Sequence, residues 1–251
     1  TQLCSAFAIP CERLKNLRGK DWQVNACWPA NDKVRLGELD GNRFTITLTK
    51  NNCGKLSNAK KISENFKKLK GMVPNLFGLQ RFGSMRKNTA EVGEHMIRKE
   101  WDKAVWNYLA NTKGEKNKDF SNARNKLKKE KDFKKALEYY PFVLKPERRM
   151  LEHLARHPHD FIGAIRTLPR NLQLMFIHAF QSQLFNEMLE IKIKNKKKLD
   201  KYSEELLVGF NSKVDENWKK LLKKHGIELS MFELKSMPEL SSEGSERKAF
   251  V

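Results

Sequence analysis

The sequence has no long apolar run, no closely spaced pair of cysteines and comparatively few acidic residues. No stretch of its 251 residues is apolar for long enough to cross a bilayer, so we do not expect a membrane protein. Cys4, Cys11, Cys27 and Cys53 are irregularly spaced and include no Cys-x-x-Cys pair. A chain of this size does not need disulfides to fold. We therefore expect reduced thiols and a cytoplasmic protein without a secretory or transit segment.

Acidic residues are outnumbered by basic ones. There are 30 Asp and Glu against 50 Lys and Arg, which gives a net charge of +20 and an isoelectric point of about 9.8. This balance favours a polyanionic partner, and nucleic acid rather than a membrane. The alternative is a general enrichment in lysine. The hydrophobic fraction of 39%, with 15 Phe and 5 Trp, allows a folded core and excludes a wholly disordered chain.

The stretch from Pro74 to Gly83 combines two glycines, large apolar side chains, an Asn, a Gln and an Arg. Gly78 and Gly83 permit a positive φ or a close approach by another chain. Phe77 offers a flat ring and Arg81 a planar cation. An aromatic ring beside an arginine on a bent loop is suited to stack an unpaired base and hold its backbone. The alternative is a strand end with core phenylalanines.

The first third of the chain predicts an α+β pattern. Alternating apolar residues predict a strand within residues 1–12, and residues 33–50 predict a β-hairpin that turns at Asp40-Gly41-Asn42. Ser57 is expected to cap a helix of about 13 residues. The lysine-rich side of this helix would contact either phosphates or solvent.

From residue 91 onward the apolar spacing is mainly helical. It predicts helices over 91–109, 171–193 and 216–225, the last ended by Gly226. The segment 113–135 has ten Lys and Arg against four Asp and Glu, so it is either a mobile basic loop or an exposed helix. It serves either as an RNA contact or as a solvated surface. The tail, 237–251, predicts a loop followed by a strand.

The helix predicted for 171–193 is apolar on more than one side and should be buried. It also carries polar side chains that would need partners in a buried helix. These are His178, Gln181, Ser182, Gln183 and Asn186.

Residues 153–160 hold three histidines and an aspartate, which raises the question of a metal site. His153 and His157 would share one side of a helix. Pro158 interrupts that helix before His159, and no thiolate or glutamate completes a recognised ligand spacing with Asp160. We therefore expect no metal here.

Four separated stretches resemble the TruD family of tRNA pseudouridine synthases, in the family's own order. The most specific is Asn75–Gly83, which reads Asn-x-Phe-Gly-x-Gln-Arg-Phe-Gly. The others are Leu36–Phe44, His178–Asn186 and Pro238–Ala249. The resemblance implies an α+β fold: a pseudouridine-synthase catalytic domain with a mixed sheet, carrying a mostly helical TRUD insertion. We expect the catalytic domain to comprise 1–95 and 236–251, and the insertion 96–235.

The resemblance also implies an activity, the isomerisation of a uridine in the D-arm of tRNA (the uridine 13 type) to pseudouridine. The base would be flipped from its stack and an aspartate would attack the nucleoside, with no metal or organic cofactor. By position, Phe77 would stack on the uracil and Asn75 would organise the site. Gly78, Gln80 and Arg81 would complete the substrate-binding loop. The expected partner is tRNA or another structured RNA, bound by a monomer.

One departure concerns the nucleophile, which the family carries in a Gly-x-Lys-Asp-x-x-x-x-Thr-x-Gln motif. Thr1-Gln2 resembles the end of that motif, so the aspartate is expected before Thr1 and a strand after Val251, as in a chain truncated at both ends. We expect Asp21, Asp32 and Asp40 to be structural. The alternatives are an inactive RNA-binding module of the same fold and a ribosomal or scaffold protein that uses its lysines nonspecifically.

Overall fold

The computed structural model describes the chain except for residues 1–3, 36–55, 69–70, 84 and 196–201. The chain forms two compact units, Thr1–Lys61 and Ile62–Val251. The hairpin predicted for 33–50 turns within the residues that are not described. No helix in the described ranges is both long enough and apolar enough to span a bilayer.

The first unit contains the short helix α1 (Cys11–Lys15) followed by a bridge between Arg18 and Gln23. The strand predicted within residues 1–12 is wrong where the structure describes it, from residue 4 onward. Pro10 has no N–H to donate to a sheet, and its extended conformation instead leads into α1. Ala8 has a φ of 56°, which breaks any extended run before it. Helix α3 (Leu56–Lys68) has 13 residues, the length expected, but it begins at Leu56, so the prediction that Ser57 precedes and caps it is wrong.

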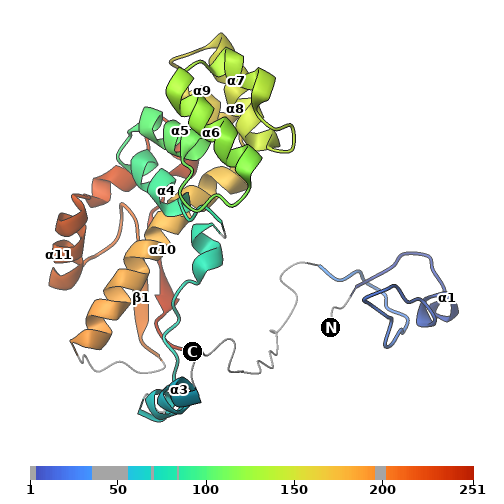
Figure 1. Cartoon of the computed structure of the whole chain (residues 1–251). Coiled ribbons are helices and arrows are strands. Elements are labelled where there is room, and N and C mark those ends of the chain that lie inside the picture. The colour runs from blue at the N-terminus through green and yellow to red at the C-terminus, as the bar shows by residue number, and fades with distance from the viewer. Residues whose placement is uncertain (1–3, 36–55, 69–70, 84, 196–201) are drawn as a thin grey trace. The chain divides into compact units, whose positions relative to one another are not determined.

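The second unit is mainly helical, and its elements follow in chain order (Figure 1). They are the 3₁₀ turn η1 (Leu79–Phe82), α4 (Thr89–Ile97), α5 (Trp101–Ala110), α6 (Lys118–Glu130), α7 (Phe133–Tyr139), α8 (Lys145–Arg156), α9 (Phe161–Arg166), α10 (Arg170–Lys194), β1 (Glu204–Val208), α11 (Glu216–His225), η2 (Leu229–Phe232), η3 (Pro238–Leu240) and β2 (Gly244–Lys248).

Most of the helix predictions are confirmed. Helix α10 is one residue longer at each end than expected, and α11 ends before Gly226, which has a φ of 58°. The basic segment 113–135 contains the helix α6, so it is not a loop over those residues. The single helix expected over 91–109 is wrong, because the chain breaks between α4 and α5, where Lys99 has a φ of 61°.

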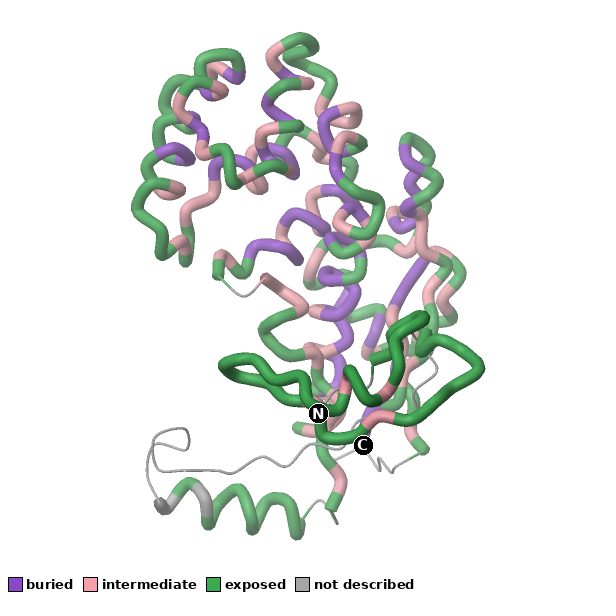
Figure 2. Tube along the Cα trace, turned by 90° about the vertical axis from the view of Figure 1, so that its right-hand side faces the viewer, coloured by how far each residue is buried: buried purple, intermediate pink, exposed green. Residues whose placement is uncertain are grey.

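Helix α10 is the axis of the second unit. It runs from the cluster of α5 to α9 down to β1 (Figure 1), and it packs most extensively against α4. Gly93 allows this contact, because a Cβ there would lie 2.0 Å from the carbonyl oxygen of Phe176. Phe180, Phe185 and Met188 of α10 are fully buried, and the buried residues follow this helix along its length (Figure 2).

Strands β1 and β2 form an antiparallel pair, with Glu204 opposite Lys248 and Val208 opposite Gly244. The residues just after β2 continue this pairing, and on their opposite edge they pair with residues 73–75. Val73 and Val251 exchange two backbone hydrogen bonds, of 2.8 and 3.0 Å, and the N–H of Asn75 donates to Ala249 O. The strand predicted in the tail is confirmed, and so is the α+β class. Within the described residues the sheet is antiparallel.

Polar side chains of α10 have partners inside this fold. Gln181 is buried and donates to Val208 O at 2.6 Å and to Ser242 Oγ at 2.8 Å. Ser182 donates to His178 O at 2.6 Å. The helix is therefore bonded to β1 and to the segment just before β2.

A buried arginine pair holds the helical end together. Arg124 of α6 donates to Glu147 of α8 at 2.8 Å, to Leu109 O at 2.9 Å and to the Tyr140 hydroxyl at 2.9 Å. Arg86 lies 3.6 Å from the same carboxylate of Glu147. One basic residue of the 113–135 segment is therefore a core residue, whereas the lysines of α6 remain available to solvent.

Candidate functional site

The stretch between Pro74 and Gly83 is fixed to α10 by one side chain. Asn186 accepts a hydrogen bond from the Phe77 N–H at 2.9 Å and donates to the Phe77 carbonyl at 2.9 Å. A primary amide has one acceptor and one donor side, so Asn186 satisfies both backbone groups of Phe77 at once. The backbone of Phe77 is thereby held as it would be by a neighbouring strand.

The same stretch is fixed to the C-terminal segment by Asn75. Its backbone N–H donates to Ala249 O at 2.9 Å, and its side-chain Nδ2 donates to Lys248 O at 2.9 Å. Its Oδ1 accepts a hydrogen bond from Arg247 at 2.7 Å. Asn75 and the segment 247–249, which are far apart in the chain, therefore meet at one place, beside the C-terminal half of α10.

The ring of Phe77 is surrounded by two guanidinium groups and another ring. The Cζ of Arg247 lies 4.1 Å from its centroid, and the Cζ of Arg81 lies 4.9 Å from it. Phe185 of α10 contacts the ring edge-to-face, at 5.4 Å between centroids and an interplanar angle of 76°. Both cations lie within the range of favourable cation–π contacts.

These two arginines have no counter-charge among the described residues. No carboxylate of that part of the chain forms an ion pair with either guanidinium. Partial burial lowers the pKa of Arg247, and the positive charge of Arg81 lowers it further. The Nε of Arg247 is buried and has no hydrogen-bond partner. The site is therefore positively charged and incompletely satisfied.

His178 extends the polar part of the site along α10. Partial desolvation lowers its pKa, and the charge of Arg81 contributes in the same direction. His178 is consequently neutral near pH 7, and its ring can accept or donate one hydrogen bond at each nitrogen.

The structure places the five expected site residues unequally. Asn75, Phe77 and Arg81 come together, whereas Gly78 and Gln80 lie exposed on the same loop. Gly83 has a positive φ, at 92°, whereas Gly78 has a φ of −78°, so of the two expected roles only close approach by another chain is left for Gly78. A Cβ added at Gly78 would meet no described atom within 4 Å, so the space beside it is open.

Sequence reasoning missed Asn186, Phe185 and Arg247 as site residues. The signal was present, because all three lie in stretches that were singled out for their resemblance to one family. Nothing in the sequence alone shows that an amide on a helix would bond the backbone of a residue more than a hundred positions earlier.

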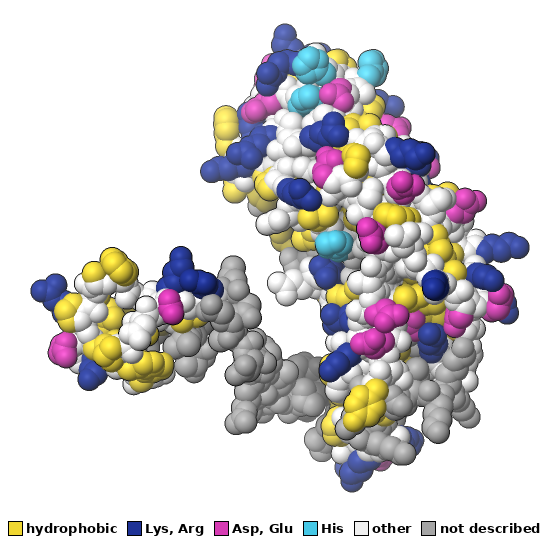
Figure 3. Space-filling view, turned by 180° about the vertical axis from the view of Figure 1, so that it is seen from behind, with side chains coloured by type: hydrophobic (Ala, Val, Ile, Leu, Met, Phe, Trp, Pro, Cys, Tyr) yellow, Lys and Arg dark blue, Asp and Glu magenta, His cyan; other side chains and the backbone are white. Residues whose placement is uncertain are grey.

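Other polar candidates have local structural roles. Asp132, Asp160 and Asp215 each accept a backbone N–H at the start of a helix, from Lys135, Gly163 and Trp218. His153 bonds Asp160 at 2.8 Å and its ring lies 5.2 Å from that of His157. Figure 3 shows several histidines at one end of the second unit and another farther along it, and basic side chains spread over this side rather than confined to one patch.

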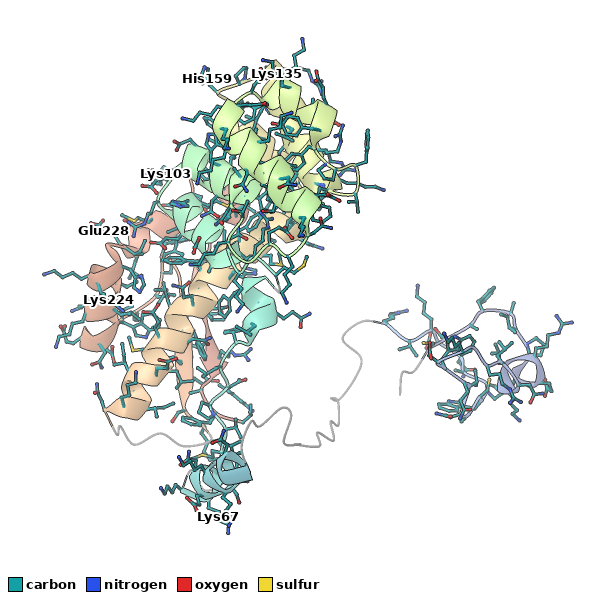
Figure 4. The ribbon with its side chains drawn as sticks, in the orientation of Figure 1. Lys67, Lys103, Lys135, His159, Lys224 and Glu228 are labelled. Carbon is teal, nitrogen blue, oxygen red and sulfur yellow. The ribbon has the colours of Figure 1, made fainter. Side chains whose placement is uncertain are left out.

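A hollow in the second unit lies away from Phe77 and is not lined by it. It has a volume of about 540 Å³ and is shallow, with Trp106, Phe133 and Phe161 among its lining residues. His159 also lines it, and Figure 4 shows His159 and Lys135 at the same end of the unit, both directed outward. Basic and acidic side chains alternate along its rim, from Glu130 to Lys134, so its charge does not favour an anion.

The sequence and the fold are both similar to those of known proteins. The family model described as tRNA pseudouridine synthase D (TruD) matches residues 1–219. A probable tRNA pseudouridine synthase D of Methanopyrus kandleri is 36% identical over 267 residues, which cover 100% of this chain and 66% of that protein. The corresponding protein of Methanococcoides burtonii is 35% identical over 196 residues, covering 77% and 45%.

A solved structure supports the same assignment. The crystal structure of a putative tRNA pseudouridine synthase D from Methanosarcina mazei matches with a TM-score of 0.80 and 27% identity, over 96% of this chain and 66% of that one. The chain thus spans no more than about two thirds of the length of these relatives. On the family match and the relatives together, the chain belongs to the TruD family of tRNA pseudouridine synthases.

Proposed function

We propose that this chain is part of an enzyme that converts a uridine of tRNA to pseudouridine, in the D-arm at the position of uridine 13. The observation that carries the proposal is the ring of Phe77 between two guanidinium groups that lack a described counter-charge. A flat apolar surface beside unneutralised arginines fits an unpaired base with its phosphate.

In this proposal the target base leaves its stack and lies against Phe77. Extrusion of a base costs a few kcal/mol, which a preformed aromatic surface returns. Asn75 holds the loop against Lys248 and Arg247, so it organises the site. Arg81 and the exposed Gln80 bind the nearby phosphates, and the open space beside Gly78 admits the ribose.

The reaction breaks the bond from C1′ of the ribose to N1 of uracil and forms a bond from C1′ to C5, while C5 loses its proton and N1 gains one. The attacking aspartate belongs, in this proposal, to residues before Thr1, where the family motif places it. The aspartates Asp132, Asp160 and Asp215 cap helices, which is a structural role. The reaction needs no metal or organic cofactor.

The proposed organisation has a catalytic domain formed by 1–95 and 236–251, and an insertion formed by 96–235. The pairing of Val73 and Asn75 with the segment after β2 supports the joining of the two outer parts. The insertion would carry helices α5 to α11, and the exposed lysines of α6 would contact the tRNA body as a monomer binds it in the cytoplasm.

The test uses an unmodified tRNA transcript and measures pseudouridine at each uridine. The 251-residue chain is compared with a version extended upstream by its own coding sequence. Pseudouridine in the D-arm with the extended version, and its loss in the extended Phe77→Ala variant, is the expected result. Pseudouridine at another position would overturn the D-arm assignment.

An inactive RNA-binding module is the second candidate. The observation that favours it is that Asp132, Asp160 and Asp215 cap helices, so none of the three is placed as a nucleophile. It predicts that both versions bind the transcript without forming pseudouridine. Phe77→Ala separates both candidates from nonspecific binding by lysines. Loss of stacking on one base weakens binding by about 1–3 kcal/mol, whereas nonspecific binding would keep its affinity and its steep salt dependence.

A further inference from the structure

We infer that Arg247 is a positioning residue of the Phe77 site, which holds Asn75 and Phe77 in the arrangement that receives an extruded uridine. The inference rests on the proposed function and adds a residue to it. Arg247 lies in β2, whereas Asn75 and Phe77 precede η1, so the site depends on the C-terminal strand.

Arg247 makes two kinds of contact at the same time. Its terminal nitrogen donates to Asn75 Oδ1 at 2.7 Å, while its Cζ lies 4.1 Å from the centroid of the Phe77 ring. A guanidinium group can donate within its plane and stack with its flat side. A lysine ammonium has no such plane, so it can replace the charge but not this combination of contacts.

The backbone around Arg247 is fixed independently of its side chain. Arg247 pairs with Glu205 of β1, and Ala249 O accepts the Asn75 N–H on the opposite edge. The side chain therefore leaves a rigid strand and reaches a segment that the same strand already holds. A change of the side chain alone should leave this pairing in place.

The position of Arg247 is costly for the folded state. Its Nε is buried without a partner, and partial burial and Arg81 both lower its pKa. Unpaired buried donors reduce stability. The neighbouring Lys248 side chain is exposed and bears no such cost. A residue that packs an unneutralised charge against a ring serves the site rather than the stability of the sheet.

Arg81 differs from Arg247 in how firmly it is held. It lies in η1 and contacts the Phe77 ring at 4.9 Å, and no side-chain hydrogen bond to it is formed by the described residues. When a base occupies part of the ring surface, Arg81 is free to leave it and bind a phosphate. Arg247 stays, because its bond to Asn75 fixes it.

The experiment uses a tRNA transcript that carries 2-aminopurine next to the target uridine of the D-arm. Its fluorescence rises when the uridine leaves the stack. The 251-residue chain should raise the fluorescence at saturation. Arg247→Lys should remove at least about half of that rise, while the dissociation constant stays within about threefold, since the charge is kept. Lys248→Gln, the matched control, should keep the full rise.

A second variant keeps the inference testable if the first affects folding. Asn75→Ala removes the partner of the same hydrogen bond, so it should reduce the rise as Arg247→Lys does. The double variant should then lose little more than either single variant, as expected for two residues that act together. Thermal unfolding of each variant checks that the strand pairing is intact.

Two results would overturn the inference. One is a full fluorescence rise in a folded Arg247→Lys variant. The other is an equal loss of affinity in Arg247→Gln and Lys248→Gln with the rise retained, which would leave Arg247 as a general phosphate contact. Failure of the proposed function looks different, because the unsubstituted chain would then give no rise at all, and Phe77→Ala would bind the transcript equally well.

Discussion

Among the described residues, two pairs of neighbouring arginines that lie on aromatic rings differ in whether a carboxylate neutralises them. Arg86 lies over Tyr108 and Arg124 over Tyr140, at 5.3 and 5.8 Å from the ring centroids. Glu147 lies between these two arginines. Arg81 and Arg247 share the ring of Phe77, and no described carboxylate pairs with them.

The difference supports a structural role for the first pair and the proposed binding role for the second. Burial lowers the pKa of Arg86, Arg124 lowers it further, and Glu147 offsets part of both effects. At Arg247 the same lowering of the pKa has no offset among the described residues. A pair that lacks an internal anion is completed by an external one, such as a phosphate. The comparison therefore supports an anionic ligand at Phe77 and none at Tyr108.

The largest expected effect comes from removing the carboxylate of the structural pair. Glu147→Gln removes the carboxylate that lies 2.8 Å from Arg124 and 3.6 Å from Arg86, and it leaves Arg124 only the longer pair with Glu115 at 3.7 Å. Loss of one partner of a buried pair costs about 3–5 kcal/mol. Urea unfolding should show this loss. Glu239→Gln is the control, because Glu239 is more exposed and lies 3.4 Å from Arg166, and its loss should cost about 0–1 kcal/mol. Equal losses in both variants would contradict the assigned role of Glu147.

The next effect concerns the amide that holds the Phe77 backbone. Asn186→Leu leaves the N–H and the carbonyl of Phe77 without their partners, at a cost of about 1–3 kcal/mol. We expect a lower unfolding midpoint and weaker RNA binding together. Gln183→Leu, one turn earlier on α10, removes only a long bond of 3.4 Å to Glu187 and should change neither measurement. If RNA binding survives Asn186→Leu, the loop geometry that Asn186 holds is not required for RNA recognition.

A third change converts the binding pair toward the structural one. His178→Glu places a carboxylate near Arg81, as Glu147 is placed near Arg124. Stability should be unchanged or slightly higher, whereas affinity for a tRNA transcript should fall by about tenfold, with a smaller dependence on salt because fewer phosphates are bound. His178→Gln, which adds no charge, should retain most of the affinity. If both variants bind equally, the arginines at Phe77 do not bind phosphate.

Helices α10 and α11 were predictable from the sequence because each is set by local spacing and by its end residues. Helix α11 begins after Asp215, which accepts the Trp218 N–H, and ends where Gly226 adopts a positive φ. The break between α4 and α5 was not predictable, because the apolar spacing continues through Lys99. Its positive φ is a property of the packed structure.

The site was predictable in part. The composition of the loop from Asn75 to Arg81 suggested a stacking ring beside a cation, and both are present. The pairing of that loop with Ala249 and the position of Arg247 depend on long-range strand contacts, which no local pattern encodes. Sequence therefore identified the loop, and the fold supplied its partners.

The smallest effect is a pH dependence that comes from His178. Its pKa in the folded state is lowered by partial desolvation and by Arg81, while the unfolded chain should titrate near the ordinary value of about 6.5. As the pH falls through that value, the unfolded state binds the proton first, so stability that is present above it is lost on acidification. Unfolding midpoints between about pH 8 and about pH 5 should therefore fall less in His178→Gln than in the unsubstituted chain.

Bound RNA should reverse the direction of the pKa change at His178, because a phosphate at Arg81 favours the protonated ring. An equal loss of stability on acidification in both proteins would mean that Arg81 does not lower the pKa of His178. His178 of α10 would then not belong to the site formed by Arg81 and Arg247.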